Sequence, residues 1–207
     1  MIDTLLQSIV GSLRAASPLE HLALLAGLGY ALLAVRRDHR AWVFGALSSG
    51  LLAWLAAGAA LPLQAMLQSL YVVMAVYGRA STPKAAAKIG WAYGFGYFLL
   101  ALAWIVNPFL VEPERDGWMA PFALVLLPAM LGLFWATAFA AGKRLGGGSL
   151  ALAGALALVE GLRAVLFTGF PWALLGHVWI DTPHAQLAAW IGPHGLTLLT
   201  VLLAAAI

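Results

Sequence analysis

The chain alternates between long apolar stretches without charge and short polar segments. The apolar stretches carry hydrophobic residues on every side and approach the roughly 20 residues that a membrane-spanning helix needs. Strands exposed on one face would instead show strict alternation of apolar and polar residues. The pattern predicts an all-α integral membrane protein with about seven transmembrane helices. We expect these helices over residues 18–35, 41–58, 62–78, 89–110, 118–141, 149–168 and 185–207.

Residues 1–14 show a different pattern. Their apolar side chains recur at helical spacing and form a single stripe, in a segment too short to cross a bilayer. We therefore expect a short N-terminal helix that lies in the membrane interface. No basic residue precedes this apolar run, so we do not expect a secretory signal peptide.

Composition supports the membrane assignment. Of 207 residues, 63% are hydrophobic and only 9% are charged, against roughly 25% charged in soluble domains. This excludes a soluble enzyme and a nucleic-acid-binding protein. The sequence contains no cysteine, which excludes disulfides, thiolate metal sites and a cysteine nucleophile within these residues. We expect no cofactor and no metal.

The charges between the predicted helices alternate in sign. The segments after the first, third and fifth predicted helices are basic, and the others are neutral or mainly acidic. Positive charge marks cytoplasmic loops, so we expect the N-terminus outside and the C-terminus in the cytoplasm. The basic residues are Arg36, Arg37, Arg40, Arg79, Lys84, Lys88, Lys143 and Arg144.

Two charged residues lie well inside a predicted span. Glu160 and Arg163 are spaced i,i+3 and share one helix face. Each would cost about 2.5–3.5 kcal/mol at the bilayer centre, so we expect the two to neutralise each other. A structural ion pair that orients this helix and a functional pair both remain open.

An aromatic turn follows this helix. Glycine and proline end the helical pattern, and Phe170, Trp172 and Trp179 fit an aromatic belt at the outer interface. An anchoring turn and a functional motif both remain open. The candidate residues are Thr168, Gly169, Phe170, Pro171 and Trp172.

Amide side chains and glycines mark other helix faces. Gln64 and Gln68 are spaced i,i+4, with Tyr71 following, and either bond across helices or line a solute path. Small-residue faces for close helix packing are expected at Gly27, Gly29, Gly90, Gly94 and Gly96.

Residues 89–207 resemble the N-terminal membrane region of apolipoprotein N-acyltransferase. The resemblance rests on the run from Gly90 to Phe98, on Glu160-Gly-Leu-Arg163, and on Leu166 to Trp172. It implies binding of membrane phospholipid, with a lipoprotein substrate as a further candidate, in the bacterial inner membrane. Family members carry a Glu-Lys-Cys triad in a nitrilase-like domain. These residues contain no such domain and no cysteine to match the nucleophile, so we expect no catalysis by this chain alone.

Residues 18–78 resemble the first three helices of the nicotinamide riboside (mononucleotide) transporter family. The matching features include Glu20, Gly27-Leu28, Phe44-Gly45, Gln68 and Tyr77-Gly78. This resemblance implies a solute path along Gln64, Gln68 and Tyr71, and a homo-oligomer through these helices. We therefore divide the chain into a transporter-like unit, 1–80, and an acyltransferase-like membrane region, 81–207.

Three interpretations follow. We favour a non-catalytic membrane scaffold of the acyltransferase type. The alternatives are a transporter-like module and a membrane chain without function of its own, whether a natural fusion, a truncated reading frame or a chimera.

Overall fold

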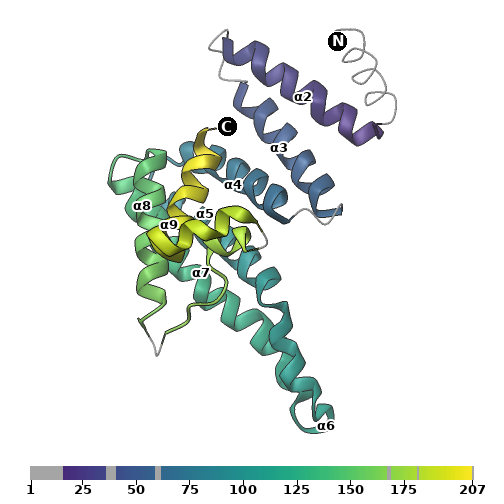
Figure 1. Cartoon of the computed structure of the whole chain (residues 1–207), viewed down its shortest axis with the longest axis vertical. Helices are drawn as coiled ribbons and strands as arrows, with labels where there is room; N and C mark the ends of the chain where they lie inside the picture. Colours follow the sequence, from purple (N-terminus) through teal and green to yellow (C-terminus); the bar gives the residue numbers. More distant parts are fainter. Residues whose placement is uncertain (1–15, 36–40, 59–61, 167–168, 181, 207) are drawn as a thin grey trace. The chain divides into compact units, whose positions relative to one another are not determined.

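The computed structural model describes residues 16–35, 41–58, 62–166, 169–180 and 182–206, and these residues contain helices and no strand (Figure 1). The all-α prediction is confirmed for them. The predicted interfacial helix over 1–14 lies outside the described residues. The helices are α2 (Pro18–Val35), α3 (Ala41–Gly58), α4 (Pro62–Gly78), α5 (Pro83–Ala101), η1 (Ala103–Leu110), α6 (Pro113–Asp116), η2 (Gly117–Met119), α7 (Ala120–Arg144), α8 (Ser149–Arg163), η4 (Leu175–Trp179), η5 (Pro183–Leu187) and α9 (Ala188–Ala206).

The chain forms two compact units, and the boundary between them falls between Ala75 and Val76, inside α4. In the first unit α2 packs against α3. The Ser48 hydroxyl donates to the Ala23 carbonyl over 2.9 Å. A Cβ on Gly29 would lie 2.8 Å from the Phe44 ring, so the expected close packing along the small-residue face of α2 is confirmed.

In the second unit α5 lies alongside α7, and the two helices form a long hairpin with α6 at its tip (Figure 1). Phe98 and Trp135 are completely buried between them, and the Tyr97 ring stacks on Trp135 at 4.9 Å. Gly90 and Gly94 face α7 closely, as expected. The expectation for Gly96 is wrong, because a Cβ there would meet no atom within 4 Å.

The predicted single helix over 89–110 is wrong at both ends. Helix α5 begins at Pro83, where the Thr82 hydroxyl accepts a hydrogen bond from the Ala85 amide over 3.1 Å. Lys84 and Lys88 therefore lie on the helix rather than in a loop. The helix ends at Ala101, and η1 continues from Ala103 at an angle of 46°.

Two further boundaries differ from the prediction. Helix α8 ends at Arg163 rather than at residue 168. The predicted helix over 185–207 is interrupted at Gly192, whose φ of 69° is left-handed. Glycine adopts this conformation without steric cost, and Pro193 then has no amide hydrogen to continue the helical ladder.

Two helical stretches are long and apolar enough to cross a membrane. They are Pro113–Arg144, with 32 residues, and Pro183–Ala205, with 23 residues. The bent pair of α5 and η1 makes a third if it counts as one span. The described residues thus establish an all-helical chain with two membrane-competent helices, or three with the bent pair.

Candidate functional site

Residues 169–179 form a segment between α8 and η5 that is irregular up to Leu174 and ends in the short helix η4. The central part of this segment is buried, with Leu174 at 2% and Leu175 at 0% exposure. A buried backbone needs partners for its amides and carbonyls, because each unpaired group costs about 1–3 kcal/mol. The partners come from side chains on three helices, which we call the anchoring cluster: Tyr97, Glu160, Arg163 and Thr197.

Arg163 holds the first half of this segment. One of its terminal nitrogens donates to the carbonyls of Phe170 and Trp172, both at 2.8 Å, and the other lies 3.4 Å from the Ala173 carbonyl. The guanidinium also lies over the Phe98 ring, 5.0 Å from its centroid. With only 1% of its surface exposed, Arg163 serves as a buried multiple donor rather than as a surface charge.

Glu160 holds the second half of the segment. It is fully buried and accepts hydrogen bonds from the Leu175 amide, over 3.1 Å, and from the Thr197 hydroxyl. The two charges interact electrostatically, as expected, but they form no direct ion pair: the direct ion pairs found among the described residues join Arg115 to Glu112 and Asp116. Both side chains point instead to backbone groups of the segment that follows their helix.

Helices α5 and α9 complete the anchoring cluster. The Tyr97 hydroxyl donates to the Leu174 carbonyl over 3.2 Å. Thr197 accepts from the Gly176 amide over 3.1 Å while donating to Glu160. Sequence reasoning missed Tyr97 and Thr197. The available signal for Thr197 was a pair of hydroxyls, Thr197 and Thr200, spaced i,i+3 in an apolar helix, where they can bond across helices.

The predicted turn residues lie at the edge of this arrangement. Thr168 lies outside the described residues. Gly169 adopts a left-handed conformation with φ of 85° as the chain leaves α8, and Phe170 donates its amide to the Arg163 carbonyl over 3.0 Å. Pro171 is exposed, and Trp172 is 59% exposed, with its ring edge-on to Trp104.

Trp179 departs from the predicted aromatic belt. It is buried, and its indole nitrogen donates to the Thr200 hydroxyl over 2.7 Å.

The backbone of Ala173 is strained. Its φ of 54° is a left-handed conformation, which costs a non-glycine residue about 1–3 kcal/mol and persists only where the surrounding structure holds it in place. The hydrogen bonds of Arg163 supply that constraint.

His177 lies in η4 and is half-buried. Burial, with Arg163 and His194 nearby, lowers the pKa of His177 from its usual value. A neutral imidazole is therefore favoured at pH 7, and the segment adds no second positive charge beside Arg163.

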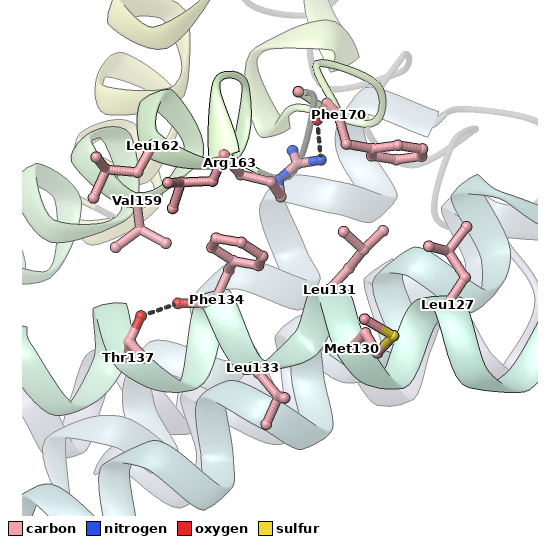
Figure 2. Close-up of a pocket in the computed structure, with 12 residues that line it drawn as sticks. Leu127, Met130, Leu131, Leu133, Phe134, Thr137, Val159, Leu162, Arg163 and Phe170 are labelled. Atoms are coloured by element: carbon pink, nitrogen blue, oxygen red, sulfur yellow. Dashed lines mark hydrogen bonds between the residues drawn. The ribbon is translucent and has the colours of Figure 1, made fainter.

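An apolar cavity of about 590 Å³ lies between α7, α8 and the start of the irregular segment (Figure 2). Arg163 is the charged residue of its lining. The hydroxyl of Thr137, also in the lining, already donates to the Phe134 carbonyl over 2.7 Å. The lining consists of Leu127, Met130, Leu131, Leu133, Phe134, Thr137, Val159, Leu162, Arg163, Leu166, Gly169 and Phe170.

The predicted solute-path residues belong to the other unit. The side chain of Gln64 lies outside the described part of α4. The Oε1 oxygen of Gln68 is buried and has no hydrogen-bond partner among the described residues. Tyr71 is buried, and its hydroxyl oxygen lies only 2.5 Å from the position that a Cβ on Gly45 would take.

The family model and the most similar known proteins agree on one family. A family model described as the apolipoprotein N-acyltransferase N-terminal domain matches residues 48–206, which confirms the resemblance predicted for 89–207 and extends it toward the N-terminus. Apolipoprotein N-acyltransferase of Brucella suis is 44% identical over 126 residues, covering 58% of this chain and 24% of the relative. The enzyme of Caulobacter vibrioides is 43% identical over 122 residues, covering 56% of this chain and 23% of the relative. The chain thus spans about a quarter of the length of these relatives.

Proposed function

The chain belongs to the family of the apolipoprotein N-acyltransferase N-terminal domain, and from this premise we propose that it is a non-catalytic membrane scaffold for lipoprotein maturation. The scaffold binds phospholipid and presents the segment 169–179 to a lipoprotein substrate. The observation that carries this proposal is the anchoring cluster, in which buried polar side chains serve one irregular segment.

Membrane physics explains why such a cluster supports a functional role. Non-helical backbone in a membrane protein is tolerated where it is buried in protein or lines a water-filled cavity, and the centre of this segment is buried at Leu174 and Leu175. Ionisable residues there are expensive and mark functional regions. If the helix simply continued past Arg163, its backbone would bond to itself and no buried charges would be needed. The free-energy cost of burying Glu160 and Arg163 therefore argues that the segment after α8 must hold a defined shape.

The same geometry argues against catalysis by these residues. Both oxygens of Glu160 accept hydrogen bonds from structural groups, which leaves this carboxylate poorly placed to act as a general base. The chain has no cysteine for the nucleophile that the family uses. Chemistry is therefore proposed to reside in residues beyond those of this sequence or in a partner.

We further propose a bacterial inner-membrane location with seven spans, the N-terminus outside and the C-terminus cytoplasmic. Support comes from the alternation of loop charge. Single cysteines at Ser81 and Gly147 should be protected from an impermeant thiol reagent in intact cells, and one at Gly117 should be labelled. Labelling at Ser81 with protection at Gly117 would reverse the orientation.

The scaffold role is tested with a chimera. Residues 82–206 replace the matched segment of the Brucella suis relative, and the chimera is produced in a strain depleted of its own acyltransferase. We expect the chimera to restore growth and the Glu160→Leu chimera to fail, because the segment 169–179 loses its anchor. Leu158→Ala, at an exposed apolar position of the same helix, is the matched control. A folded parent chimera that fails to restore growth would contradict the proposal.

One observation supports the transporter alternative. The buried Oε1 oxygen of Gln68 has no partner within the described part of the chain and is a group that a polar solute would satisfy. Against it, the acyltransferase family model begins at residue 48 and so includes α4. Uptake of labelled nicotinamide riboside by cells that produce the chain, lost in Gln68→Leu, would favour a transporter module that works as a homo-oligomer through α2–α4.

A further inference from the structure

The end of the α5–α7 hairpin that lies opposite the α6 tip carries positive charge without compensation (Figure 1). We call the five cations at this end the basic collar: Arg79, Lys84, Lys88, Lys143 and Arg144. All are exposed except Lys143, which is half-buried. The acidic residues between positions 76 and 159 lie at the other end of the hairpin, and they are Glu112, Glu114 and Asp116. Among the described residues, the collar therefore has no acidic partner.

Contacts within the second unit bring the members of the collar to one end. The Lys143 ammonium donates to the Gly78 carbonyl over 3.4 Å, which places the end of α7 beside the turn that carries Arg79. Helix α5 runs antiparallel to α7, and Gly90 meets Phe139 where they pack. The first turn of α5 thus lies near the last turn of α7.

The cations of the collar surround this end and do not converge on one point. Ala86 and Gly90 are buried on the face of α5 that packs on α7. Lys84 and Lys88 each lie two residues from Ala86, about 160° away around the helix, so both belong to the face turned away from α7. A compact anion needs cations that converge on a pocket. Charges spread around a helix end suit a layer of anions.

Lys84 also opposes the dipole of its own helix. The N-terminus of a helix carries partial positive charge, which favours acidic residues in the first turn and disfavours basic ones. Helix α5 has no acidic residue in its first turn, and Lys84 lies there. An anion outside the chain would interact favourably with the lysine and with the dipole together.

The collar lies at the depth of lipid headgroups when the hairpin crosses a bilayer. The 25 residues of α7 extend over about 36 Å, against about 30 Å for the hydrocarbon core. With the acidic tip on one side, the last turn of α7 reaches the headgroups of the other. Leu145 and Leu150, which are 72% and 69% exposed, lie at this end too and suit the edge of the hydrocarbon region better than water.

We propose that the basic collar binds the phosphate groups of anionic phospholipids, of the phosphatidylglycerol type, in the leaflet that this end faces. Lys84 and Lys88 contact headgroups on one side of the hairpin, and Arg144 does so at the end of α7. The inference goes beyond the scaffold role, because Tyr97, which bonds to the segment 169–179, lies about 20 Å along α5 from Lys84. It needs only a hairpin that crosses a bilayer.

The test compares two lipids at the surface of the full chain in phosphatidylcholine bilayers. Spin-labelled phosphatidylglycerol and spin-labelled phosphatidylcholine are added separately, and electron spin resonance measures the fraction of each that the protein immobilises. We expect phosphatidylglycerol to associate roughly fivefold more strongly, the factor for one basic side chain near an anionic surface. This preference should disappear at about 1 M salt, where the Debye length is about 3 Å.

Variants of the collar separate its charge from its structure. The double variant Lys84→Gln/Lys88→Gln should lose at least about half of the preference, whereas Lys84→Arg/Lys88→Arg should keep it. Arg115→Gln, at an exposed cation of the opposite end that is already paired, is the matched control and should keep it too. Because Lys84 opposes the helix dipole, the glutamine variant should unfold in neutral detergent at the same temperature as the parent or higher.

Several outcomes would overturn the proposal. Equal association of the two lipids with the parent chain would reject the lipid surface and leave an acidic protein as the partner. A preference that survives Lys84→Gln/Lys88→Gln would place the lipid away from the collar. Displacement by inorganic phosphate at constant ionic strength would indicate a compact anion site instead. Earlier unfolding of the glutamine variant in neutral detergent would show that the two lysines serve the fold.

Discussion

Replacing Arg163 by leucine should destabilise the second unit by about 3–5 kcal/mol, the range for removing one partner of a buried charged network. The carbonyls of Phe170 and Trp172, each 2.8 Å from the guanidinium, would lose their donor in a buried place. Ala173 would also lose a restraint on its left-handed φ of 54°. Glu160 would remain as a buried charge without a cation nearby.

The effect is measured as the thermal midpoint of the purified chain in detergent, together with proteolysis of the segment 169–179. Arg115→Leu is the matched control, since Arg115 is paired with Glu112 at 2.9 Å but is 73% exposed, where an ion pair is worth only about 0–1 kcal/mol. Arg163→Lys, which keeps the charge but not the planar fork of donors, should fall between. If Arg163→Leu costs no more than Arg115→Leu, the anchoring role is wrong.

The anchoring cluster also shows what the sequence predicts and where it stops. The i,i+3 spacing of Glu160 and Arg163 correctly predicted two buried charges on one helix face. It did not predict their partners, because spacing within a helix says nothing about backbone that arrives from outside it. The Phe170 and Leu175 groups reach this face only after the chain has left α8 at Gly169.

The helix boundaries were likewise predictable in some places and not in others. Charge-free stretches predicted α2, α3 and α4 correctly, because prolines, glycines or basic residues lie at their ends. The same criterion placed the start of α5 too late, since Lys84 and Lys88 end an apolar stretch but not a helix. The true start signal was Thr82 followed by Pro83, an N-cap and a proline at the first helical position.

The break in α9 had a comparable local signal. Gly192-Pro193 combines a residue free to adopt positive φ with one that cannot donate to the helical ladder. A continuous apolar pattern around this pair hid the break, since hydropathy measures only what the side chains prefer. The kink matters for the site, because Gly176 packs against the Pro193 carbonyl and the side chain of Leu196 at this point.

Substituting alanine at Gly90 should disrupt the packing of α5 on α7, whereas the same change at Gly96 should be neutral or stabilising. A Cβ on Gly90 would lie 2.6 Å from the backbone oxygen of Trp135 and 2.6 Å from the Phe139 ring. A backbone atom cannot rotate away as a side chain can, so the helices must separate. Overpacking of this kind typically costs about 1–3 kcal/mol.

Gly96 provides the control within the same helix, since a Cβ there meets no atom within 4 Å. Alanine stabilises a helix interior by up to about 1 kcal/mol relative to glycine. Both substitutions gain this amount, so the difference between their midpoints reports the contact between α5 and α7 alone. Thermal unfolding in detergent measures it. We expect a lower midpoint for Gly90→Ala and an unchanged or higher one for Gly96→Ala. Equal midpoints for the two variants would mean that α5 and α7 are not held together at Gly90. Because Tyr97 reaches the Leu174 carbonyl from α5, that result would also weaken the case that the α5–α7 hairpin supports the segment 169–179.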